Sequence, residues 1–207
     1  MSLTRLLAIQ KGIKSCRDCP NMVGGPVHGA PVLSRVFLLG QAPGIHEEGR
    51  GKPFAHTAGK TLFKWFEETG GVDEEHFRAH VYMAAVARCF PGKAGSGDRL
   101  PDAKEIERCR RHLAQEVALL KPELILPVGK LAIAQVLGPD IYGSKAKLED
   151  VIGKKFVAAF LEHEADVICL PHPSGLSAWP KIEPGKTLLR KALRMIVKHP
   201  AWIEEMG

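Results

Sequence analysis

The chain has 207 residues, of which 45% are hydrophobic and 25% charged, a composition typical of one globular domain over residues 1–207. It has no apolar run near the ~20 residues that a membrane span needs and no signal-peptide core at its N-terminus, which predicts a cytoplasmic protein. The net charge of +6 favours a polyanionic partner, nucleic acid above all.

The first half of the chain alternates between helical and strand patterns. Apolar residues at helical spacing predict a helix over 3–14. The apolar run at 36–40 closes with a glycine and is typical of a strand buried on both faces. A helix is predicted over 57–69, ended by Gly70 and its neighbour, and a second buried strand over 81–87.

The second half repeats these patterns, with one ambiguous stretch. The Phe-Val-Ala-Ala-Phe segment within 141–165 is typical of a strand or a hairpin edge. The other predicted elements are, in chain order, a loop over 90–101, a helix over 102–120, a strand over 123–129, a helix over 130–137, a strand over 166–171 and a helix over 184–198.

Strands that are apolar on both faces and alternate with helices predict a parallel sheet between two helical layers. The expected fold class is α/β, a three-layer α/β/α sandwich with a central four-stranded parallel sheet. Ligands of such sheets bind at the carboxyl ends of the strands. The segments after the four strands should therefore converge on one cleft: Gly-Gln-Ala-Pro-Gly, Ala-Arg-Cys-Phe-Pro-Gly-Lys, Val-Gly-Lys and Pro-His-Pro-Ser-Gly-Leu-Ser.

The five cysteines fit a disulfide framework poorly, because their number is odd and the expected compartment is reducing. Cys16 and Cys19 form a Cys-x2-Cys pair in an irregular loop. With Cys89 and Cys109 they supply four ligands, for either a zinc ion or a [4Fe–4S] cluster. The alternative is that Cys89 and Cys109 are buried thiols, although Cys109 lies among charged residues. Cys169 lies inside an apolar strand and is assigned to the core.

Residues 40–66 combine a Gly- and Pro-rich loop after a strand with a helix that starts near Thr57. A glycine turn brings backbone N–H groups close to a ligand, and a helix N-terminus favours an anion. A generic phosphate-binding loop is therefore one interpretation. The Walker spacing of glycines and lysine is absent.

Together with Pro-His-Pro-Ser at 171–174, this segment closely resembles the iron–sulfur uracil-DNA glycosylases of families 4 and 5. Those proteins carry a Gly-Glu-Ala-Pro-Gly loop, a Gly-x-Pro-Phe…Ala-Gly segment and a His-Pro-Ser loop in this order. The resemblance runs from Cys16 to the final helix. It implies a uracil-DNA glycosylase-like fold, DNA as the partner, and a [4Fe–4S] cluster held by four cysteines: Cys16, Cys19, Cys89 and Cys109.

The resemblance also implies which residues bind the base. Phe54 would stack on a flipped-out base, the alternative being plain core packing. His172 would donate a hydrogen bond to the pyrimidine O2 and stabilise the leaving anion, the alternative being a solvent-facing histidine. Backbone amides between Gln41 and Gly44, that of Ala42 among them, would face the base carbonyl.

Other positions would contact the DNA itself. Ser174 and Ser177 would bind phosphates on either side of the damaged nucleotide, and Leu176, or alternatively Trp179, would wedge into the gap in the duplex. Lys60 and Arg99 would contribute phosphate charge. The alternative for both cations is a solvated surface charge.

The sequence departs from the family pattern at two places. Gln41 stands where family 4 has Glu, and an amide can orient a water molecule but cannot deprotonate it. Glu47, in the same loop, is the candidate substitute; an exposed loop charge is the alternative. Ala85 stands where the family has an Asn that reads uracil, a loss worth roughly 1–3 kcal/mol of base discrimination. Asp98 similarly replaces an Asn.

The expected function is a DNA repair glycosylase that hydrolyses the N-glycosidic bond of a flipped-out base, uracil or another deaminated base. The departures at Gln41 and Ala85 motivate an alternative, a catalytically weak or inactive iron–sulfur protein that binds DNA lesions. A redox or zinc protein unrelated to DNA would require the His-Pro-Ser loop to be a coincidence. A monomer is expected.

Overall fold

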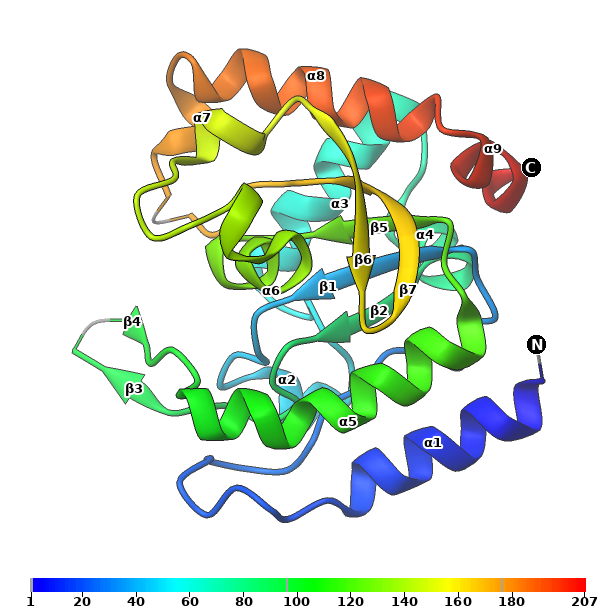
Figure 1. Ribbon diagram of the computed structural model, residues 1–207, viewed down its shortest axis with the longest axis vertical. Coiled ribbons are helices and arrows are strands. Elements are labelled where there is room, and N and C mark those ends of the chain that lie inside the picture. Colours follow the sequence, from blue (N-terminus) through cyan, green and yellow to red (C-terminus); the bar gives the residue numbers. More distant parts are fainter. Residues whose placement is uncertain (1, 96, 176) are drawn as a thin grey trace.

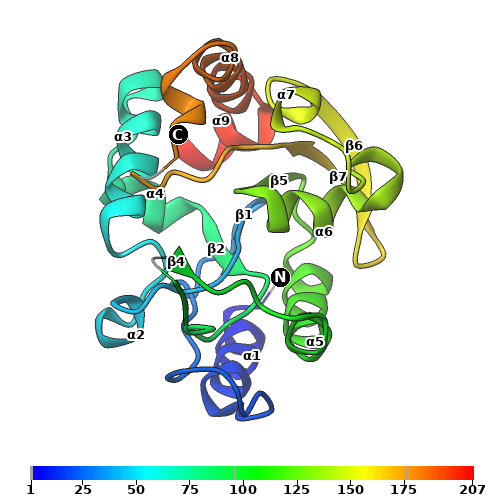
Figure 2. The ribbon, with the colours of Figure 1, turned by 90° about the vertical axis from the view of Figure 1, so that its left-hand side faces the viewer.

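The computed structural model describes residues 2–95, 97–175 and 177–207. A five-stranded sheet lies between two layers of helices (Figure 2). The layer formed by α1, α5 and α6 covers one face, and α3, α4, α8 and α9 cover the other. The helices are α1 (Leu3–Ser15), α2 (Glu47–Arg50), α3 (Thr57–Gly70), α4 (Glu74–His80), α5 (Ala103–Leu120), α6 (Lys130–Ile141), α7 (Leu148–Val151), α8 (Gly185–Val197) and α9 (Pro200–Met206), with a 3-10 turn at Trp179–Lys181.

The central sheet has the strand order β2-β1-β5-β7-β6. Its strands are β1 (Val36–Gly40), β2 (Tyr82–Ala85), β5 (Leu124–Pro127), β6 (Lys155–Phe160) and β7 (His163–Ile168). The α/β class and the four parallel strands are confirmed. The sheet is nevertheless mixed, because β6 adds a fifth strand that runs antiparallel to β7. Burial alternates along β6, as is typical of an edge strand, whereas β1, β2 and β5 are buried at every position.

The strand and loop boundaries differ from the sequence prediction for local reasons. The second strand ends at Ala85, although the N–H groups of Val86 and Ala87 still donate to the carbonyls of Gly40 and Gln41 and keep the following segment beside the loop after β1. The predicted loop over 90–101 holds a small hairpin of β3 (Lys93–Ala94) and β4 (Gly97–Asp98), which projects from the carboxyl edge of the sheet (Figure 1).

Helix boundaries follow from capping residues. Asp102 and Glu105 form a reciprocal capping box at the start of α5, with bonds of 2.9 and 2.8 Å. Asp73 caps α4 by accepting a hydrogen bond of 2.8 Å from the N–H of His76. A break at Gly138, where φ is +70°, interrupts α6. None of the helices within the described ranges has both the length and the apolar character to cross a membrane.

A buried polar network links α5 to the sheet. The Arg88 guanidinium forms an ion pair with Glu116 in the interior, and Tyr82 donates a hydrogen bond of 2.6 Å to the same carboxylate. On α1, Gln10 donates to the carbonyl of Gly29 at 3.2 Å. A buried charge must be paired to be tolerated, so these contacts fix how α5 lies against β2.

Candidate active site

A cavity of about 340 Å³ opens at the carboxyl ends of β1 and β2, where the sequence predicts a cleft. The loop after β1, the turn at Phe54, the end of β2 and the loop after β7 all line it. Seven of the predicted site residues meet at this cavity: Gln41, Ala42, Glu47, Phe54, Ala85, His172 and Ser174.

Phe54 has an unusual backbone conformation, with φ at +53°. A side chain other than glycine rarely adopts this conformation, so other contacts must hold it. Arg78 of α4 donates hydrogen bonds of 2.9 Å to the carbonyls of Pro53 and Phe54. The same guanidinium stacks over the ring of Phe63, 4.5 Å from its centroid, and pairs with Glu74. Arg78 therefore holds the backbone of the turn at Phe54.

Two glycines make room for Phe54. A Cβ atom at Gly40 would come within 3.0 Å of the Phe54 ring, at the last residue of β1. A Cβ atom at Gly59, in the first turn of α3, would lie 1.7 Å from the Phe54 carbonyl oxygen. The absence of side chains at these two positions brings the strand end, the aromatic ring and α3 into direct contact.

Glu47 is a buried carboxyl group in the wall of the cavity. Burial raises its pKa to about 7, although hydrogen bonds from the backbone N–H groups of Phe54, Gly44 and Ala55 favour the charged form. The folded-state pKa lies above the ordinary value of 4.5, so ionisation of Glu47 reduces stability as pH rises between these values. Its neighbour Glu48 is exposed and accepts a hydrogen bond of 2.6 Å from Gly25.

His172 is a neutral hydrogen-bond donor at the cavity. Burial lowers its pKa, and the negative charge of Asp98 opposes this effect only in part. Its Nδ1 accepts a hydrogen bond of 3.2 Å from the N–H of Ser174. A neutral imidazole that accepts at Nδ1 carries its proton on Nε2, which leaves Nε2–H free to donate.

The loop after β5 supports His172 from behind. Gly129, with φ at +87°, would place a Cβ atom 3.3 Å from the His172 side chain, and its N–H donates to the carbonyl of Leu170. A second cavity of about 590 Å³ lies on this side, and Gln41, His172 and Ser177 are among its lining residues. Gln41 and His172 thus separate two adjoining cavities.

The predicted DNA contacts have different surroundings. Lys60 is exposed on α3. Desolvation lowers the pKa of His56 at the cavity wall, and the charge of Lys60 adds to this effect. Arg99 forms two hydrogen bonds of 2.8 Å with Glu105 and another of 2.8 Å with the carbonyl of Pro91. These contacts give Arg99 a structural role in holding the hairpin against α5. Leu176 lies outside the described residues.

Four of the five thiols influence one another electrostatically. Burial raises the pKa of Cys89 to about 12, and proximity to Cys109, Cys16 and Cys19 raises it further. Burial also raises the pKa of Cys109 and of Cys19, again with contributions from the other thiols. For Cys169 burial alone acts, because this thiol lies apart in the core.

The surroundings of the four thiols suit an anionic metal–thiolate centre. Arg111 lies 3.6 Å from the Cys16 sulfur, and Arg108 forms a hydrogen bond to Cys19. Arg88 keeps its Nε and Nη1 atoms buried without a partner in the described part of the chain. As they stand, the side chains of residues 2–95, 97–175 and 177–207 do not bring three possible ligands together as a metal site. The donor set of four soft thiolates fits an iron–sulfur cluster or zinc.

The structure places at the site three side chains that were not predicted there from the sequence. Arg78 acts through backbone carbonyls about 25 residues away in sequence, which no motif reveals. Asp98 of β4 lines the cavity and pairs with Lys93 at 2.6 Å. His56 precedes α3 and lies against His46, with ring centroids 4.6 Å apart.

Comparison with known proteins gives a consistent result. Residues 26–197 match the family described as the uracil DNA glycosylase superfamily. A Type-4 uracil-DNA glycosylase of Pyrobaculum aerophilum is 29% identical over 177 residues, 82% of this chain and 83% of the relative. Proteins of the same name from Sulfurisphaera tokodaii and Archaeoglobus fulgidus are each 27% identical, covering 80% and 84% of this chain and 73% and 84% of the relatives.

The fold and the site define an α/β protein with a cavity at the carboxyl ends of the sheet strands, the edge at which sheets of this kind bind ligands. The chain belongs to the uracil DNA glycosylase superfamily, because the family match covers most of its length. This confirms the resemblance to uracil-DNA glycosylases and the expected fold.

The contact between α3 and the Phe54 turn can be tested at Gly59. Gly59→Ala forces the Phe54 carbonyl or α3 to move and should lower the free energy of unfolding by about 2–3 kcal/mol. The control is Gly12→Ala on α1, which meets open space and should raise stability by about 0.5–1 kcal/mol. Urea unfolding measures both. Equal stability changes in the two variants would contradict the close contact.

Proposed function

We propose that this protein is a DNA N-glycosylase that excises uracil or another deaminated base. The observation that carries the proposal is the single cavity shared by Phe54, Glu47 and His172 at the carboxyl edge of the sheet. The relatives named Type-4 uracil-DNA glycosylase support the same activity. A cavity of this size admits one base, which must leave the stack to enter it.

The reaction breaks the bond between C1′ of the sugar and the base nitrogen, and the electron pair leaves with the base. Phe54 presents its ring to the face of the base. The Nε2–H of neutral His172 donates to the base oxygen, where negative charge develops as the bond breaks. The oxygen of a water molecule then bonds to C1′. The proton that this water loses must pass to a general base of the protein.

We assign Glu47 as the general base that accepts this proton. Its pKa of about 7 matches the value at which a general base works best near neutral pH. Gln41, between the two cavities, orients the water through its amide. The ionised Glu47 also accepts the backbone N–H of Phe54, so one group both positions the aromatic ring and receives the proton.

Because Ala85 stands at the end of β2, no side-chain amide at this position can bind the edge of the base. A bidentate amide contributes roughly 1–3 kcal/mol of discrimination between bases, so we expect weaker selection against bases other than uracil. The catalytically silent alternative is not favoured. The cavity retains a neutral donor in His172 and a carboxyl group that titrates near neutral pH in Glu47.

We further propose that Ser174 and Ser177 bind the phosphates that flank the flipped nucleotide, with Lys60 adding charge and Leu176 filling the gap. Ser174 and Ser177 line the two cavities, and the N–H of Ser177 donates to the carbonyl of Ser174 at 3.1 Å. The functional unit is one domain over residues 1–207, acting as a cytoplasmic monomer on damaged DNA.

We also propose that Cys16, Cys19, Cys89 and Cys109 hold a [4Fe–4S] cluster. The argument rests on the mutual influence of these thiols and on the arginines around them. A cluster there would supply structural cross-linking. The four residues come from the loop after α1, the segment after β2 and α5, so their ligation would join these segments.

The glycosylase proposal is tested with oligonucleotides that carry uracil, hypoxanthine or xanthine. Wild-type protein should generate alkali-labile sites with at least one of them under single-turnover conditions. His172→Ala should lower the rate about 10²–10³-fold, because a donor to the developing anion is lost. His80→Ala, at a half-buried histidine on α4 that does not line the cavity, is the control and should not change it. Absence of product with all three bases would overturn the proposal.

The role of Glu47 predicts a pH dependence. A general base must be deprotonated, so the single-turnover rate should rise with pH through about 7. Glu47→Gln should abolish this rise and lower the rate at pH 8 about 10²-fold. Glu48→Gln, a change at the exposed neighbour, should retain the rise. An unaltered pH profile in Glu47→Gln would assign the proton transfer to another group.

The cluster is tested by analysis of protein purified anaerobically. It should be brown, with a broad absorption shoulder and about four iron atoms per chain. Cys109→Ser should lose iron and colour, whereas Cys169→Ser, which changes a thiol that lies apart in the core, should keep both. A colourless wild-type protein that contains zinc would contradict the cluster.

A further inference from the structure

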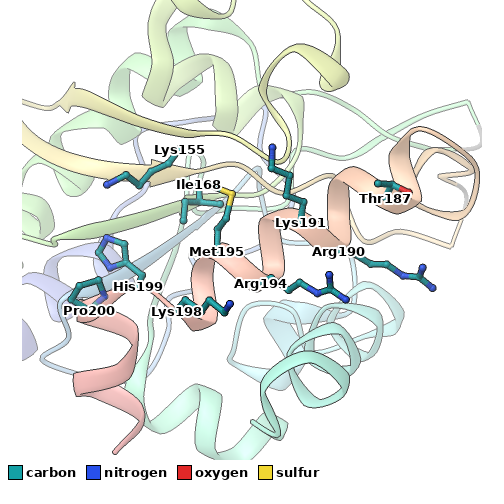
Figure 3. A pocket seen from close by; sticks show the side chains of 10 residues that line it. All are labelled: Lys155, Ile168, Thr187, Arg190, Lys191, Arg194, Met195, Lys198, His199 and Pro200. Atoms are coloured by element: carbon teal, nitrogen blue, oxygen red, sulfur yellow. The ribbon is translucent and has the colours of Figure 1, made fainter.

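Helix α8 borders an open groove of about 670 Å³, larger than the base cavity. Figure 3 shows it between α8 and the β6–β7 hairpin. Ile168 and Met195 form an apolar floor between Lys155 on one side and the α8 cations on the other. None of the described residues that line this groove also lines the base cavity, so the two are separate features.

The groove is strongly basic. No Asp or Glu is among its described lining residues, which include five cations: Lys155, Arg190, Lys191, Arg194 and Lys198. Of these five, only Lys155 has an ion pair within the described ranges, at 2.7 Å from Asp166. Glu68, which lines the neighbouring cavity on the α3 side, is paired with Lys64. The positive charge on α8 is therefore largely uncompensated.

The cations on α8 recur at regular spacing. Lys186, Arg190 and Arg194, together with Lys198 directly after the helix, follow one another every four residues, and all four are exposed. On an α-helix this spacing places a cation about every 6 Å along a slowly winding stripe roughly 18 Å long. A long, open line of cations complements a linear polyanion, whereas a small anion is held by donors that converge on it.

We propose that the α8 groove binds the phosphate backbone of DNA at a distance from the flipped base. This inference rests on the proposed function, which supplies DNA as the polyanion. Helix α8 begins beside the carboxyl edge of the sheet and runs away from it (Figure 1). The stretch of DNA that contacts α8 therefore lies outside the lesion site. This contact retains the enzyme on undamaged DNA during the search for a lesion.

The test measures binding to a lesion-free DNA duplex over a range of salt concentrations. Arg190→Gln/Arg194→Gln should reduce the magnitude of the slope of log Kobs against log[salt] by about 1–2, because each lost phosphate contact contributes about 0.9. The charge-matched control is Arg5→Gln/Lys11→Gln on α1, in the opposite helical layer (Figure 1), which should leave the slope unchanged. Arg190→Lys/Arg194→Lys should restore the wild-type slope.

Each other outcome has a distinct meaning. A slope that Arg190→Gln/Arg194→Gln leaves unchanged overturns the proposal. If Arg190→Gln/Arg194→Gln leaves the salt slope unchanged but loses binding to vesicles of anionic phospholipid, the groove binds a lipid surface instead. Excision at saturating substrate should be equal in wild type and variant, because the base cavity is separate. If wild type excises no base while the slope still falls, the glycosylase proposal fails and the α8 contact stands.

Discussion

The backbone turn at Phe54 is the constraint on which the base cavity depends. A positive φ at a phenylalanine is unfavourable by itself, and the surrounding contacts offset that cost. Arg78 binds two carbonyls of the turn, Glu47 accepts its N–H groups, and Gly40 and Gly59 allow the ring and the carbonyl to pack closely. Because every contact is internal to the protein, the aromatic wall is in place before a ligand enters.

One physical cause gives the cavity its two chemical functions. Desolvation disfavours whichever form of a group is charged, so it lowers the pKa of His172 and raises that of Glu47. Near neutral pH the same walls therefore hold a neutral imidazole that can donate and a carboxyl group that can still lose its proton. A more hydrated cavity would shift both pKa values back toward their ordinary values, so the neutral donor and the general base would be lost together.

Much of this architecture was predictable because its signals are local. The runs at 36–39 and 124–128 are continuously apolar and are each followed by a glycine, and the parallel order of their strands brings the following loops to one edge. The fifth strand was only suggested, since β6 alternates in burial and pairs antiparallel at the edge. Arg78 and Arg99 left no usable signal, because their partners are backbone carbonyls and a carboxylate that only the folded chain brings near.

The packing of α1 has a consequence for biosynthesis. This helix lies against α5, which begins at Ala103, 88 residues after α1 ends at Ser15 (Figure 1). Leu6 and Ile13 are fully buried in the finished protein, yet while the chain is being made their partners have not emerged from the ribosome. The first helix therefore docks on α5 only after that helix has been made, and the nascent chain carries an uncovered apolar stripe through about half of its synthesis.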